Sequence, residues 1–240
     1  MSNRRQNVLF VLTSHDSLGD TGKPTGFHFD ELAAPYWRFM DAGYQVEIAS
    51  IAGGRPPHDP SSLSEDEEQR SGSLQRFLDD TDAMAKLEKT PSVDAVKAER
   101  YCAIYLPGGH GAMWDMPDCE ALGGLLLAAQ DNGAAIGAVC HGPAGLLAAR
   151  RGDSYPLVTG RRVNAFTDEE ERRVHLASVM PFLLETRLKD AGGRFEKSSP
   201  FRACVVRDGS LVTGQNPRSA RAVADKMLEI MQDERTENAA

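Results

Sequence analysis

Short apolar runs alternate with segments of helical hydrophobic spacing along most of the chain. Asn7–Thr13, rich in Val and Leu, predicts a buried strand, and Gln45–Ala49 predicts the next one. Between them, residues 30–42 carry large apolar side chains at helical spacing, and Gly43 follows as a typical helix stop. A strand, a helix and a strand of these lengths predict two parallel strands joined by a crossover helix.

The same alternation returns after residue 100 and continues almost to the end of the chain. We therefore expect an α/β fold: a doubly wound, mostly parallel sheet sandwiched by helices. The expected strands are Ala103–Leu106, Ala134–Val139, Val163–Phe166, Arg194–Glu196, Ala203–Val206 and Ser210–Thr213, and the expected helices are Glu120–Asn132, 143–149, Val179–Ala191 and Asn216–Met231.

Residues 61–100 interrupt this pattern because they are charged and carry only scattered apolar side chains. Glu65–Glu68 is an acidic run, for which a solvated surface is the ordinary interpretation. We expect helices and loops laid over the edge of the sheet, as a helical cap. No internal repeat or low-complexity tract divides the chain, so residues 1–240 are expected to form a single domain with 61–100 as an insertion.

Composition and charge narrow the classes of partner. The 240 residues include 27 basic and 35 acidic side chains, a formal net charge of −8, which argues against nucleic acids and acidic membranes. No apolar run approaches the ~20 residues of a membrane span. Val8–Leu12 is too short for a signal-peptide core, so we expect a cytoplasmic protein. The four cysteines form no CxxC pair, which favours neither a disulfide framework nor a zinc ribbon.

Two loops lie where ligands bind in such folds, at the carboxyl ends of strands. The first is Leu106–Gly111 (LPGGHG), in which three glycines let the backbone approach a ligand and present its N–H groups. A tight turn without any ligand explains this loop equally well when it is taken alone.

The second loop, Ala138–Pro143 (AVCHGP), places Cys140 between a strand and a helix with small residues around it, as in a nucleophile elbow. The dipole and free N–H groups at the start of that helix would favour the thiolate. A buried cysteine that merely ends a strand is the alternative. It describes Cys102 or Cys204 well and Cys140 poorly, because a core residue does not require His and Gly after it.

Four segments resemble the ThiJ/PfpI superfamily: GFHFDELAAPY, LPGGHGAMWD, AVCHGPAGLL and LVTGQNP, which occur in the same order between about Asn7 and Met231. The chain is most similar to the branch of heat-shock chaperones and glutathione-independent glyoxalases (glyoxalase III). The resemblance implies a flavodoxin-like fold of the class I glutamine amidotransferase type. It also implies a homodimer.

The resemblance implies a catalytic triad and an acidic partner for the cysteine. Cys140 matches the nucleophile and His141 the base, and the family spacing selects Glu171 as the acid. The sequence alone leaves Asp168–Glu170 as rivals, and an acidic cluster often starts a solvated helix.

Glu31 matches the acidic partner of the cysteine, with Asp30 as its rival from the sequence alone. A partly buried carboxylic acid beside a thiolate can donate a hydrogen bond or move a proton. By the resemblance, the backbone N–H groups of Gly109 and His141 form an oxyanion hole, which would stabilise a developing alkoxide.

The remaining histidines and one tryptophan carry weaker expectations. By the resemblance, His110 and Trp114 line the substrate pocket, although a turn histidine and a packed aromatic are the ordinary interpretations of each alone. Some relatives hold zinc, but no His/Glu ligand set stands out here. His28, His58 and His175 are expected at the surface or in turns, so we expect neither a metal nor a cofactor.

The leading hypothesis from the resemblance is a cofactor-free glyoxalase III of the D-lactate dehydratase type. It would convert a small 2-oxoaldehyde, methylglyoxal, to lactate through a hemithioacetal on the cysteine. A thiolate, a proton shuttle and an oxyanion site meet the needs of this reaction. The alternatives are a PfpI-type cysteine amidase or peptidase, a stress-related holdase chaperone for unfolded clients, and a redox sensor.

Overall fold

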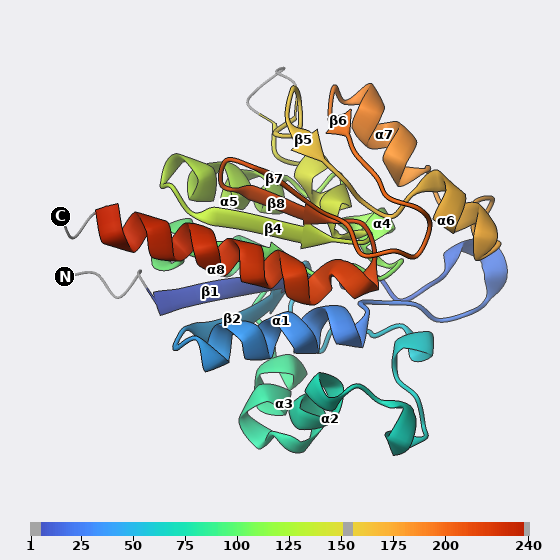
Figure 1. Cartoon of the computed structure of the whole chain (residues 1–240). Coiled ribbons are helices and arrows are strands. Elements are labelled where there is room, and N and C mark those ends of the chain that lie inside the picture. The colour runs from blue at the N-terminus through green and yellow to red at the C-terminus, as the bar shows by residue number, and fades with distance from the viewer. Residues whose placement is uncertain (1–5, 151–155, 238–240) are drawn as a thin grey trace.

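A six-stranded sheet forms the centre of the fold in the computed structural model, which describes residues 6–150 and 156–237 (Figure 1). Its strands are β1 (Asn7–Leu12), β2 (Gln45–Ser50), β3 (Ala103–Leu106), β4 (Ala135–Val139), β7 (Val205–Asp208) and β8 (Leu211–Gly214). The spatial order is β2-β1-β3-β4-β8-β7, and only β7 runs antiparallel to its neighbour. This order begins as in flavodoxin-like folds, so the expected doubly wound, mostly parallel sheet is confirmed.

Strand β1 shows why this sequence forms a sheet covered on both faces. All six of its side chains are buried, and successive side chains point to opposite faces. Phe10 packs with the apolar residues of α1 (Phe29–Asp41) and α8 (Ala220–Glu237), whereas Leu9 packs with those of α5 (Glu120–Asp131). In Figure 1, α1 and α8 accordingly cover one face of the sheet, and α5 lies behind it.

Several predicted helices have different bounds, for local reasons. The segment after Cys140 is a short 3₁₀ helix, η7 (Gly142–Leu147), because two glycines and a proline in six residues do not support an α-helix. The helix expected from Val179 begins at Leu184, since Pro181 disfavours helical backbone before it. This helix is α7 (Leu184–Asp190). The structure also has α4 (Ala112–Asp115), α6 (Asp168–Arg173) and the 3₁₀ turn η8 (Pro217–Ser219).

Two short strands that the sequence predicts lie outside the main sheet. β5 (Arg162–Val163) and β6 (Arg194–Phe195) pair in parallel with each other and form a separate two-stranded sheet. β6 lies beside α7 (Figure 1). Within the described ranges, no helix is long and apolar enough to cross a membrane.

Residues 61–100 form α2 (Gly72–Asp79), α3 (Thr81–Glu88) and several 3₁₀ turns, so the expected helical content is present. These helices lie beside α1 at the β2 edge of the sheet, and α3 contacts β2 (Figure 1). The Trp37 indole donates a hydrogen bond to the Ser73 carbonyl, and the Arg76 guanidinium lies 3.7 Å above the Trp37 ring. The cap function and the single-domain organisation of 1–240 stay predictions, and residues 1–5, 151–155 and 238–240 lie outside the described part.

Candidate active site

The chemistry-bearing residues meet at the carboxyl ends of the central strands. Cys140 and His141 follow β4, the Gly108–His110 loop follows β3, and Glu31 lies in the first turn of α1. Parallel strands end at the same edge of the sheet, which is how segments distant in sequence reach one site. Glu171 joins them from α6.

Cys140 occupies a strained turn. Its φ is 58°, a conformation that non-glycine residues rarely adopt. Its N–H donates to the Gly214 carbonyl of β8 at 2.9 Å, and its own carbonyl accepts from the Phe166 N–H at 2.9 Å. A β-carbon at position 142 would lie 2.2 Å from the Leu106 carbonyl oxygen, so only glycine fits after the Cys-His pair. The backbone therefore has the nucleophile-elbow geometry that the sequence predicts.

His141 links the thiol to a carboxylate. Its Nδ1 lies 3.3 Å from Cys140 Sγ, and its Nε2 lies 2.7 Å from Glu171 Oε2. A carboxylate only accepts hydrogen bonds, so Nε2 carries the proton and Nδ1 is free to accept one from the thiol. Burial, together with the neighbouring His110, lowers the pKa of His141. The ring is therefore a neutral base directed at Cys140.

Glu171 is the acid of the 168–171 cluster that reaches His141. Asp168 instead binds Thr186, Glu169 pairs with Arg173, and Glu170 closes the capping box with Thr167. Although burial opposes ionisation, the two histidines that contact Glu171 lower its pKa to about 2. The structure thus brings Glu171, and not its three rivals, into line with the Cys-His pair.

Glu31 lies on the other side of the thiol and is fully buried. Its Oε2 accepts a hydrogen bond from the Gly108 N–H at 2.7 Å, while Oε1 has no partner of normal geometry among the described residues. Desolvation raises its pKa to about 8, even though the Gly108 N–H and the adjacent Cys140 oppose the shift. Asp30, its rival in the sequence, instead accepts a hydrogen bond from Ser71 Oγ. At neutral pH Glu31 is a neutral acid beside the cysteine.

The expected stabilisation of a resting thiolate by a helix dipole is wrong. Burial first, and the Glu31 carboxyl beside it second, raise the pKa of the Cys140 thiol well above its usual range. The helix that was to lower this pKa is instead the short 3₁₀ segment η7, which aligns few peptide dipoles. The resting site therefore holds a thiol beside a neutral imidazole.

Two backbone donors stand next to the cysteine. Within residues 6–150 and 156–237, no hydrogen bond uses the N–H of Gly109 or of His141. The loop after β3 packs tightly on the elbow: a β-carbon at position 108 would lie 2.6 Å from the His141 backbone nitrogen. These two N–H groups are consistent with the expected oxyanion hole.

The two residues expected in the substrate pocket differ in placement. His110 belongs to the site: its Nε2 lies 3.1 Å from Glu171 Oε1, and its ring centroid lies 4.3 Å from that of His141. Trp114 stacks on His15 at 4.9 Å, and no hydrogen bond or ring contact in the described part of the chain joins it to the Cys-His pair.

Three residues near the site were missed or misplaced by the sequence analysis. Asp59 Oδ2 lies 3.8 Å from His110 Nδ1, and the Phe166 ring packs 4.8 Å from that of His141. His28, expected at the surface or in a turn, immediately precedes α1; its N–H donates to the Gly108 carbonyl, and burial lowers its pKa. Asp59 carries no local motif, and Phe166 belongs to the Ala-Phe segment that precedes the triad acid in the family, which did not mark it as a neighbour of His141. Only the GFHF segment within the family resemblance pointed to His28.

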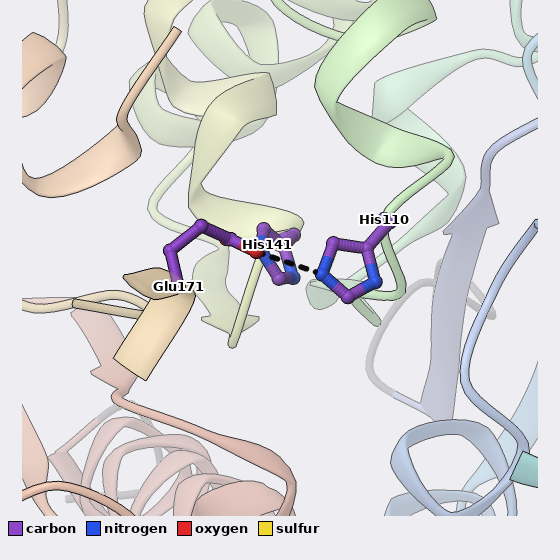
Figure 2. Close-up of side chains that lie close together, drawn as sticks. All are labelled: His110, His141 and Glu171. Carbon is purple, nitrogen blue, oxygen red and sulfur yellow. Dashed lines mark hydrogen bonds and ion pairs between the residues drawn. The ribbon is translucent and has the colours of Figure 1, made fainter. Parts of the chain in front are cut away.

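His110, His141 and Glu171 place one potential metal-binding atom each within 4.8 Å of one another, a set the sequence analysis did not recognise. Figure 2 shows both rings directed at the Glu171 carboxylate. Each imidazole nitrogen facing this carboxylate needs a proton to complete its hydrogen bond. Hydrogen bonds from the two histidines to the Glu171 carboxylate therefore explain why these three residues lie together.

A strained cysteine at the end of a central parallel strand, beside a histidine and a glutamate, defines an α/β protein with a cysteine elbow. The chain belongs to the DJ-1/PfpI family, whose model matches residues 25–230. It is 29% identical over 237 residues to glutathione-independent glyoxalase hsp3101 of Schizosaccharomyces pombe, covering 94% of this chain and 96% of that protein.

Solved structures agree with this assignment. The Francisella tularensis Rapid Encystment Protein 24 kDa superposes with a TM-score of 0.89 and 33% identity, covering 94% of this chain and 99% of that one. Glyoxalase III from Candida albicans superposes with a TM-score of 0.86 and 25% identity, covering 95% and 98%. The fold is therefore shared with these proteins over at least 94% of the chain.

Proposed function

We propose that this protein is a glutathione-independent glyoxalase that converts small 2-oxoaldehydes such as methylglyoxal to 2-hydroxy acids. The observation that carries the proposal is the placement of Cys140 between a neutral base, His141, and a neutral acid, Glu31. Moving hydrogen between two adjacent carbons requires one group that accepts a proton and one that donates it. Two similar proteins, a glutathione-independent glyoxalase and a glyoxalase III, support the same activity.

The first step is addition of the thiol to the aldehyde. As Sγ bonds to the aldehyde carbon, its proton passes to His141 Nδ1, which lies 3.3 Å away. The carbonyl oxygen becomes an alkoxide that the free N–H groups of Gly109 and His141 stabilise. His141 then returns the proton to this oxygen, and the product is a neutral hemithioacetal.

The second step moves hydrogen between the two carbons. His141 removes the proton from the former aldehyde carbon while Glu31 protonates the neighbouring ketone oxygen, which gives an enediol. His141 then protonates the second carbon, and the Glu31 carboxylate takes the proton of the first hydroxyl. Both groups return to their starting states, and the product is a thioester of the 2-hydroxy acid.

Water completes the reaction. It adds to the thioester carbonyl, the carbon–sulfur bond breaks, and the thiol regains its proton. One carbon is oxidised while its neighbour is reduced, and one water is consumed. The sequence of steps therefore balances without an external oxidant or reductant.

The test is methylglyoxal consumption by the purified protein without glutathione. Cys140→Ala is expected to abolish turnover, whereas Cys204→Ala, which removes a half-buried thiol outside the site, should leave it unchanged. Turnover that survives Cys140→Ala would refute the mechanism. A wild-type protein with a reduced thiol and no turnover would refute the function.

The alternatives have less support. An amidase or peptidase would use the Cys-His-Glu relay but has no need for a neutral Glu31, and activity on amides without activity on aldehydes would identify it. A redox sensor needs a thiolate, whereas burial raises the pKa of the Cys140 thiol. A holdase needs apolar surface, and Val174 is the only exposed large hydrophobic side chain among the described residues. The homodimer, expected from the family resemblance, and the cytoplasmic location remain part of this proposal.

A further inference from the structure

His110 lies between two carboxylates from distant parts of the chain. Its Nε2 is 3.1 Å from Glu171 Oε1, and its Nδ1 is 3.8 Å from Asp59 Oδ2. A carboxylate only accepts hydrogen bonds, so the 3.1 Å contact needs a proton on Nε2, and the Asp59 carboxylate at ion-pair distance favours a second proton on Nδ1. The two carboxylates accordingly outweigh burial and raise the pKa of His110 to about 9. At neutral pH the ring is an imidazolium.

Asp59 is held in place for this contact. Its Oδ1 accepts from the Ser61 N–H at 2.9 Å and from Ser61 Oγ at 2.6 Å, and its Oδ2 accepts from Thr25 Oγ at 3.2 Å. The Asp59 side chain is only 15% exposed. These donors and His110 hold its pKa well below the usual range. Asp59 is therefore a fixed anion and not a mobile surface acid.

The imidazolium acts directly on the proposed base. The centroids of the His110 and His141 rings lie 4.3 Å apart, and Glu171 contacts both rings. A positive charge at this distance disfavours a second one, which contributes to the lowered pKa of His141. A fixed cation also stabilises negative charge that develops on Cys140 or on the bound aldehyde oxygen.

We propose that Asp59 is a positioning residue of this site: it holds His110 in its cationic form against Glu171 and over His141, so that His141 stays the proton acceptor for Cys140. The effect of Asp59 on turnover rests on the proposed function. The contacts themselves do not depend on it. Asp59 lies in the turn immediately before residues 61–100. The side chain that contacts His110 therefore comes from the start of this insertion and not from its helices.

Other charged and titratable groups face His110. They are Asp59 before the 3₁₀ turn at 60–62, His28 and Glu31 at the start of α1, His141 after β4, and Glu171 in α6. His28 has a lowered pKa and Glu31 a raised one, so both are neutral near pH 7. Asp59 and Glu171 are the two anions in contact with the ring, and only Glu171 also contacts His141.

The first test is titration of the His110 ring by NMR in the full chain without substrate. Six histidines are present, and the His110 signal is the one lost in His110→Gln. It should titrate near pH 9 in the wild type and at least one unit lower in Asp59→Asn. Glu65→Gln is the matched control: it removes an exposed carboxylate of the neighbouring segment, for which no hydrogen bond or ion pair with Asp59 or His110 is found among the described residues, and it should leave the titration unchanged.

The second test follows alkylation of Cys140 by iodoacetamide against pH, read by mass spectrometry of its peptide. Protonation of His110 should produce an inflection in the plot of the Cys140 alkylation rate against pH. In Asp59→Asn this inflection should move to lower pH, as the NMR titration of His110 does. His110→Gln leaves the Thr25 and Ser61 contacts of Asp59 in place and should abolish this inflection. An unchanged His110 titration in Asp59→Asn, or an inflection that survives in His110→Gln, would overturn the proposal.

Turnover gives a third readout. A drop of about 1.5 units in the His110 pKa lowers its protonated fraction at pH 8.5 from roughly three quarters to one tenth. kcat/KM for methylglyoxal in Asp59→Asn should therefore fall about eightfold at pH 8.5 and less than twofold at pH 6.5. An equal loss at both pH values would mean a merely structural role. The first two tests use no aldehyde, so an inactive wild type would refute only the proposed function.

Discussion

Two glutamates flank the Cys140–His141 pair, and their environments give them opposite charge. Glu31 is fully buried with one backbone N–H as its partner, and its pKa is raised to about 8. Glu171 is also buried, but two histidines contact it and lower its pKa to about 2. Burial alone favours the neutral form of both acids, so the cationic and hydrogen-bonding partners decide the outcome. One site thereby holds a proton donor and a fixed anion made from the same residue type.

The largest expected effect concerns Glu31, the proton donor of the pair. Glu31→Gln keeps an oxygen for the Gly108 N–H but has no proton to give, so methylglyoxal turnover should fall about 10³-fold. Asp30→Asn, next in sequence and bonded to Ser71, serves as the control and should retain nearly full activity. Near wild-type turnover in Glu31→Gln would assign both proton transfers to His141.

The next effect breaks the Glu171 side. Glu171→Gln replaces the anion that accepts the hydrogen bond from His141 Nε2–H with a neutral amide, so His141 is oriented less well and becomes a weaker base. We therefore expect kcat to fall about 10²-fold while KM changes little. Glu169→Gln, which loses only an exposed pair with Arg173, is the matched control. A large rise in KM with unchanged kcat would show that Glu171 binds substrate instead.

The two glutamates should also have opposite effects on stability against pH. The Glu31 pKa rises from 4.5 to about 8 on folding, so the unfolded chain ionises first and stability falls as pH rises between these values. From pH 5 to pH 7 this group costs about 3 kcal/mol, which Glu31→Gln should recover. Denaturant unfolding of wild type and variant at both pH values measures the difference. Parallel pH dependences would contradict the neutral buried acid.

For Glu171 the sign is reversed. Its pKa falls from 4.5 to about 2 on folding, so its contribution is present above pH 4.5 and disappears as pH falls through 2. The stability gap between wild type and Glu171→Gln should therefore close by about 2 kcal/mol between pH 5 and pH 3. The same unfolding series extended to pH 3 measures it, and a constant gap would be evidence against ionic pairing with the histidines.

The smallest effect concerns Trp114, for which no hydrogen bond to either glutamate is found in the described part of the chain. Because its ring stacks on His15, Trp114→Phe keeps an aromatic surface there, and kcat/KM should stay within about twofold of wild type. The methylglyoxal assay measures it directly. A KM raised more than about fivefold would restore Trp114 to the substrate pocket that the family resemblance assigned to it.

The sequence predicts the sheet well because buried parallel strands are short apolar runs, as in β1 and β4. Helix bounds fail where Pro181 or the glycines around Pro143 override hydrophobic spacing. The elbow is visible as a local motif, since Cys140 and His141 are adjacent. The choice of Glu171 over its neighbours needs the family spacing, because all four acids are alike in sequence.

What the sequence does not reveal depends on contacts between distant segments. Asp59 and His110 come into contact only when the turn at residues 59–62 packs against the loop after β3. Neither segment has a sequence feature that predicts this contact. The direction of the Cys140 pKa was wrong for a related reason. A helix dipole is read from local sequence, whereas the burial that outweighs it is a property of the whole fold.

The hydrogen bond from the Cys140 N–H to Gly214 has a consequence for biosynthesis. β8 supplies this acceptor, and its Thr213 hydroxyl accepts from the Asn164 N–H on the segment that leads to Glu171. During translation Glu31, Cys140, His141 and Glu171 all leave the ribosome before β8 does. A nascent or truncated chain thus carries every reactive side chain yet lacks the strand that holds them in register. The hydrogen bond that fixes the Cys140 backbone can therefore form only after β8 has been synthesised.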